Sequence, residues 1–123
     1  MIAALCVGAG GFCGAIARYL LGLLPYQGQF PLITFVINFT GAVVEAASIR
    51  PGMLPPNAVL FLKTGLCGGF TTFSTFSLET LGLLERGEYA IGGAYALGSL
   101  AVCVLGVVAG KMLVRWALGT QAA

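Results

Sequence analysis

Four apolar segments constrain the fold of this chain more than any other feature. They lie at residues 2–24, 31–49, 57–84 and 90–114, and short polar or proline-rich connections separate them. About 20 apolar residues cross a bilayer as a helix. Only 8% of the 123 residues are charged, against about 25% in a soluble domain. We therefore predict an all-α membrane protein whose residues 1–123 form a single four-helix transmembrane domain.

The third segment is too long, and too poor in helix formers, for one continuous helix. As a helix its roughly 28 residues would measure roughly 42 Å, while the hydrocarbon core of a bilayer is about 30 Å thick. Near its centre, two glycines precede the run Phe-Thr-Thr-Phe-Ser-Thr-Phe-Ser, and these residue types carry larger helix penalties than Leu or Ala. We predict a break near residues 68–72. Within a membrane, such a break is tolerated only where protein buries it or where it lines a watery cavity.

The second segment carries a polar stripe. Steps of four, three and four residues place Thr34, Asn38, Gly41 and Glu45 on one helical face, which must contact protein or water rather than lipid. Two interpretations of Asn38 stay open: a hydrogen bond between helices, or an N–H donor to a passing anion.

Two small-xxx-small patterns, residues 10–14 and 106–110, predict close helix contacts.

Aromatic and hydroxyl side chains gather after the predicted break. Phe73 and Phe76 are three residues apart and share a helix face. The electropositive edges of their rings can line an anion path, although simple packing explains the same spacing. Polar side chains that can replace the water around a small anion are Asn38, Ser74, Thr75, Tyr95 and Ser99. Arg18 either snorkels to the interface, supplies positive charge near an anion entrance, or holds the fold through a carbonyl or carboxylate. The residues alone predict a site for a small ion or polar solute.

Composition argues against several other functions. The chain has no His, six Lys and Arg residues and four Asp and Glu residues, so we expect neither His-based catalysis nor a cluster of metal-binding side chains, and hence no enzyme. The net charge of +2 is too small to indicate a nucleic-acid partner. The predicted side of the membrane that holds the termini has an excess of only about two Lys and Arg residues, so orientation is weakly specified.

Three motifs resemble the CrcB/Fluc family of fluoride ion channels. They are Gly-Gly-Phe-Cys-Gly-Ala-Ile-Ala-Arg-Tyr at residues 10–19, Asn38 with Gly41, and Gly-Gly-Phe-Thr-Thr-Phe-Ser-Thr-Phe-Ser at residues 68–77. The resemblance implies an antiparallel, dual-topology homodimer in the lipid bilayer, multi-pass in the bacterial inner membrane. It also implies two fluoride pores per dimer that export fluoride passively and lower its toxicity, and a central structural sodium ion.

The resemblance also implies roles for individual residues. The fluoride pores would be lined by Phe73 and Phe76 through their ring edges, by Asn38, by the Ser74 and Thr75 hydroxyls, and by Tyr95 and Ser99 on the fourth helix. The backbone carbonyls of Gly68 and Thr71 would hold the sodium ion, and Arg18 would lie in the vestibule. Glu45 departs from the family pattern, because apolar and small residues usually follow the asparagine. Its carboxylate would repel an anion unless it faces a base such as Arg50 or Lys63, or lies beyond the vestibule.

Two other functions compete with a channel. Small multidrug transporters are also dual-topology dimers of four-helix chains, but they depend on an acidic residue within the first helix. The first acidic residue of this chain is Glu45, in the second segment. A membrane scaffold or assembly factor would suit the glycine faces, yet it would leave the predicted break unexplained.

Overall fold

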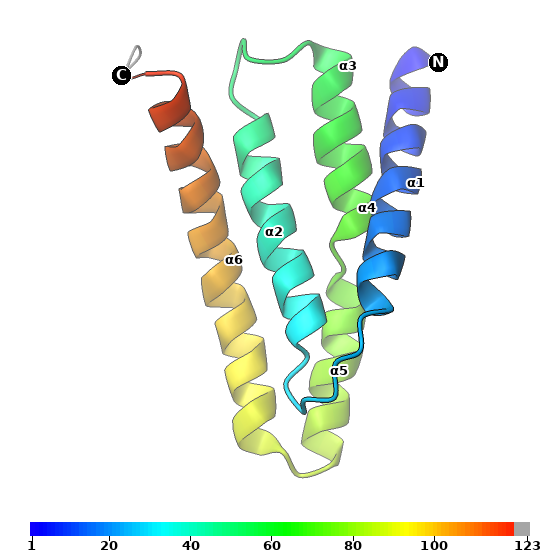
Figure 1. Cartoon of the computed structure of the whole chain (residues 1–123), viewed down its shortest axis with the longest axis vertical. Coiled ribbons are helices and arrows are strands. Elements are labelled where there is room, and N and C mark those ends of the chain that lie inside the picture. Colours follow the sequence, from blue (N-terminus) through cyan, green and yellow to red (C-terminus); the bar gives the residue numbers. More distant parts are fainter. Residues whose placement is uncertain (120–123) are drawn as a thin grey trace.

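The computed structural model describes residues 1–119, which form helices and turns without a strand (Figure 1). The last four residues of the predicted domain, 120–123, lie outside the described residues. The chain runs up and down as four helical columns: α1 (Ile2–Gly22), α2 (Leu32–Ser48), a third column of several pieces, and α6 (Tyr89–Ala117). The N-terminus and the end of α6 lie at the same end of the molecule. The predicted all-helical, four-helix architecture is confirmed.

The third column consists of four elements: α3 (Pro56–Val59), the π-helix η1 (Leu60–Cys67), α4 (Gly68–Phe70) and α5 (Phe73–Glu85). Pro56 at the first turn suits a helix start, because its fixed φ is helical and its missing N–H has no partner there in any case. Between α4 and α5, Thr71 (φ −77°, ψ 157°) and Thr72 (φ −150°, ψ 113°) have extended backbone.

The two threonines fix this extended segment by local hydrogen bonds. Thr71 donates both its N–H and its Oγ1–H to the Cys67 carbonyl, at 2.9 and 2.8 Å. Thr72 is the N-cap of α5, because its Oγ1 accepts from the Thr75 N–H at 3.2 Å, the role in which Thr stabilises a helix start. The Thr-Thr pair therefore closes one helix and opens the next.

Glycines set how closely the columns approach. Gly10 and Gly14 are buried in α1, and an added Cβ would lie 2.8 Å from Leu66 N at Gly10 and 2.8 Å from Phe70 N at Gly14. Gly65 faces them, since its Cβ would lie 2.6 Å from the Val7 carbonyl oxygen. These distances allow no side chain on either face. The close contact predicted for residues 10–14 is therefore confirmed.

Glycines also allow α2 and α6 to pack closely. Gly106 and Gly110 of α6 are buried. A Cβ at Gly106 would lie 3.2 Å from the Phe39 carbonyl oxygen, and one at Gly110 would lie 2.9 Å from Ala46 Cβ. The second predicted glycine contact thus holds α6 against α2.

We expect Gly10→Ala to lower the thermal stability of the purified protein. The added methyl group would push against backbone of the third column, and overpacking of this kind costs about 1–3 kcal/mol. Gly8→Ala is the matched control on the same helix, because its Cβ would meet nothing within 4 Å and Ala is the better helix former by about 1 kcal/mol. The measurement is the temperature at which the gel-filtration peak is lost. Equal midpoints for Gly10→Ala and the wild type would contradict the packing.

The outer surface is apolar. By length and composition, α1 and α6 are able to cross a membrane, and α2 is a shorter apolar helix. Large apolar side chains project outward, among them Phe12, Leu97 and Trp116, which are 69%, 73% and 83% exposed. A surface of this kind is suited to contact with lipid rather than water.

Candidate functional site

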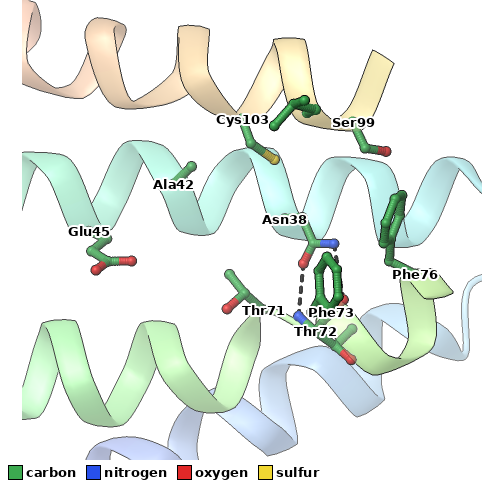
Figure 2. Close-up of a pocket in the computed structure, with 10 residues that line it drawn as sticks. Asn38, Ala42, Glu45, Thr71, Thr72, Phe73, Phe76, Ser99 and Cys103 are labelled. Carbon is green, nitrogen blue, oxygen red and sulfur yellow. Dashed lines mark hydrogen bonds between the residues drawn. The ribbon is translucent and has the colours of Figure 1, made fainter. Parts of the chain in front are cut away.

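Asn38 joins α2 to the extended segment by two hydrogen bonds. Its Oδ1 accepts from the Thr72 N–H at 2.8 Å, and its Nδ2 donates to the Thr72 carbonyl at 3.2 Å (Figure 2). The side chain thereby supplies partners for backbone groups that a continuous helix would satisfy. Nδ2 carries two N–H donors, so one donor remains after the bond to Thr72. Asn38 therefore makes the interhelical hydrogen bond and retains an N–H for a ligand.

A cavity of about 300 Å³ lies beside this contact, between α2, the extended segment and α6. We call it the Asn38 cavity. The lining residues that matter for its chemistry are Asn38, Glu45, Phe73, Phe76, Ser99 and Cys103. Four of them, namely Asn38, Phe73, Phe76 and Ser99, were predicted from the sequence as pore residues. The fold thus brings predicted residues from three helices to one cavity.

Ser99 presents an unused hydroxyl in the Asn38 cavity. It is 6% exposed, and its Oγ has no hydrogen-bond partner within residues 1–119. Other helical hydroxyls in the chain bond the carbonyl four residues earlier, as Ser48 bonds Val44 at 2.7 Å and Ser77 bonds Phe73 at 2.9 Å. A buried hydroxyl without a partner costs about 1–3 kcal/mol. Ser99 is therefore a donor available to a ligand in the cavity.

The two phenylalanines of α5 differ in their surroundings. Phe76 is half-buried, and its ring centroid lies 5.5 Å from that of Phe73 and 5.2 Å from that of Tyr95. Phe73 is 79% exposed, so most of its ring is uncovered within residues 1–119 although it lines the Asn38 cavity. Both rings lie at the N-terminal end of α5, where the helix dipole favours negative charge.

A second cavity, of about 500 Å³, lies on another side of Thr72. We call it the Arg18 cavity, and its polar lining residues are Arg18, Tyr19, Thr34, Thr72, Thr75 and Glu79. Thr72 lines both cavities. The backbone segment that Asn38 holds is therefore the wall between them.

Glu79 is a polar residue of the site that the sequence analysis does not identify. Its carboxylate accepts hydrogen bonds from Thr34 Oγ1 at 2.9 Å and from the Tyr95 hydroxyl at 2.6 Å. Tyr95 is fully buried, directs its hydroxyl to Glu79 and lines neither of the two cavities. Two signals pointed to Glu79: it follows Phe76 by three residues on the same helix, and Thr34 on the polar stripe requires a partner.

The remaining predicted residues lie around the extended segment. Ser74 and Thr75 are exposed on the first turn of α5, with hydroxyl oxygens 3.3 and 3.0 Å from Thr72 Oγ1. Arg18 Nη1 donates to the Thr71 carbonyl across 3.5 Å. Gly68 is exposed, and a Cβ there would meet nothing within 4 Å.

Glu45 lines the Asn38 cavity without a basic partner. Arg50 donates instead to the Val114 carbonyl at 3.5 Å, and Lys63 is exposed on η1. Among residues 1–119, no Lys or Arg nitrogen lies within 4.0 Å of this carboxylate. The compensating ion pair that would suit an anion path is therefore not formed within this part of the chain.

Comparison with known proteins agrees with the motifs. Residues 5–111 match the family described as CrcB-like protein, Camphor Resistance (CrcB). The chain is 45% identical over 120 residues to the "Fluoride-specific ion channel FluC" of Nitrobacter winogradskyi, covering 90% of this chain and 94% of the relative. It is 43% identical over 117 residues to the protein of the same name from Chlorobaculum tepidum, covering 90% and 93% of the two chains. The resemblance found in the sequence is thus confirmed: this chain is an integral membrane protein and belongs to the CrcB-like family.

Proposed function

We propose that this protein is a fluoride-selective channel, not an enzyme, and that it exports fluoride passively down its electrochemical gradient and so lowers fluoride toxicity in the cytoplasm. The relatives named as fluoride-specific channels support this assignment. The observation that carries it is the buried Ser99 hydroxyl, which lies at the Asn38 cavity and has no hydrogen-bond partner among residues 1–119. An unused donor beside an amide N–H and an aromatic wall is suited to a small anion.

The physical reason is the hydration of fluoride. A small, hard anion must exchange its water for other donors as it crosses a membrane, and it must bind weakly enough at each point to move on. The Asn38 cavity offers neutral donors from Asn38 and Ser99 and the aromatic rings of Phe73 and Phe76, whose edges are electropositive, and no Lys or Arg is among its lining residues in the described part of the chain. Such groups attract an anion but bind it less tightly than a full positive charge would.

We further propose that two copies assemble antiparallel, as a dual-topology homodimer with two pores at their interface. The exposure of Phe73, at 79%, supports this, because a pore-lining ring that is mostly uncovered in one subunit needs a second wall. The small excess of Lys and Arg on one predicted side of the membrane is compatible with insertion in both orientations. Bacterial relatives make the inner membrane of a bacterium the proposed location.

The extended backbone at Thr71 and Thr72 supports a third transmembrane helix that is broken near its centre, and a structural sodium ion at the break. In a continuous helix the Thr72 N–H would bond the Gly68 carbonyl, but here it donates to Asn38. That carbonyl and the Thr71 carbonyl fit a small cation, which unwound backbone in membranes commonly holds. A bound sodium ion would neutralise the partial negative charge on these carbonyl oxygens. Arg18 donates a hydrogen bond to the Thr71 carbonyl oxygen. This oxygen has a second lone pair that could bind the ion.

The test is electrogenic release of fluoride from liposomes that contain the purified protein. Vesicles loaded with potassium fluoride should release it when valinomycin provides a path for potassium, and vesicles loaded with potassium chloride should retain their chloride. Fluoride release no faster than from protein-free vesicles would contradict the proposed function.

A further inference from the structure

The Asn38 cavity has one carboxylate on its wall, and that carboxylate is not neutralised by a neighbouring base. Among the described residues that line the cavity, Glu45 is the single acidic side chain and no Lys or Arg is present. Figure 2 shows the Glu45 carboxylate on the same side of α2 as the Asn38 amide, turned toward the third column. The negative charge therefore shares a cavity with the donors that attract an anion.

Three bases of the chain that could neutralise Glu45 are not among the residues that line the cavity. Arg50 donates to Val114 at 3.5 Å, and Lys63 is exposed. Arg18 lines the other cavity and contacts the Thr71 carbonyl. A fixed charge in partly apolar surroundings acts over a longer range than it does in bulk water, and the neutral dipoles of Asn38 and Ser99 do not cancel it.

We propose that the negative charge of Glu45 slows the entry of anions into the Asn38 cavity. Its charge lowers the local concentration of fluoride at this end of the path, so it limits the rate of transport while the donors at Asn38 and Ser99 bind the ion. This inference rests on the proposed fluoride permeation. It assigns to Glu45 a role in setting the rate of that permeation, distinct from the hydrogen-bonding role of Glu79, whose carboxylate is occupied by Thr34 and Tyr95.

The test compares charge variants of nearly equal size. Glu45→Gln should raise the initial rate of fluoride efflux about three- to tenfold at about 10 mM salt. The ratio of the Glu45→Gln rate to the wild-type rate should decrease when an impermeant salt raises the ionic strength to about 1 M, because the Debye length in the water outside the cavity shrinks from about 30 Å to about 3 Å. Glu45→Asp, which keeps the charge, should transport at the wild-type rate.

Two further variants make the result specific. Glu85→Gln removes an exposed charge at the end of α5 that lines neither cavity, and it should leave the rate unchanged. Glu45→Ala provides a second neutral side chain, so an altered fold in one variant does not decide the outcome. Neutral variants that transport at or below the wild-type rate, or a gain that does not depend on salt, would overturn the role of Glu45. Wild-type protein that releases no fluoride would instead refute the proposed function.

Discussion

Asn38→Asp is expected to abolish fluoride efflux. The substitution keeps the oxygen that accepts the Thr72 N–H, but it replaces both N–H donors of the amide with a charged oxygen. The Thr72 carbonyl then faces a carboxylate in place of its donor, and an anion in the cavity meets repulsion in place of a hydrogen bond. A loss of about 2–3 kcal/mol of interaction corresponds to a decrease in rate of about 100-fold.

The same change at Asn57, near the start of the third column and outside both cavities, is the matched control. Asn57→Asp should transport fluoride at the wild-type rate. Initial rates are measured with a fluoride electrode on vesicles of equal protein content. If Asn38→Asp retains half or more of the wild-type rate, Asn38 does not contribute a donor to the path.

Phe76→Ile is expected to reduce efflux about tenfold or more while the protein keeps its elution volume on gel filtration. Isoleucine retains the apolar bulk that packs near Tyr95 in the wall of the cavity, but it has no aromatic ring and so no electropositive ring edge to offer an anion. Phe12→Ile is the control, because Phe12 is an exposed residue of α1 and lines neither cavity. Unchanged efflux in Phe76→Ile would show that the ring edge has no part in permeation.

Much of the fold could be predicted because membrane helices leave strong patterns. Segment length and apolarity gave four columns, and the paired glycines indicated faces that the structure places against neighbouring helices. The polar stripe of α2 behaves as expected: Thr34 contacts Glu79, Asn38 contacts Thr72, and Glu45 lines a cavity. Each of these features depends on the length or the residue spacing of a single helix, and both can be read from one sequence.

Contacts between helices were harder to predict, because they depend on how far one helix is shifted along another. Glu79 lies late in its segment, and its two hydroxyl partners come from other helices, because α2 and α6 both approach it. Spacing places Phe73 and Phe76 on one face, but Phe76 packs against Tyr95 of α6 and is half-buried, whereas Phe73 is exposed. The missing partner of Ser99 is a property of the packed structure alone.

The central claim, that the path is selective for fluoride, is tested most directly with both anions in the same vesicles. Liposomes loaded with equal concentrations of potassium fluoride and potassium chloride are treated with valinomycin, and both anions are followed with ion-selective electrodes. Leaks through damaged vesicles release both anions together and so serve as an internal control. We predict release of the fluoride while the chloride stays inside. Parallel release of fluoride and chloride, or retention of both, would contradict a fluoride-selective channel.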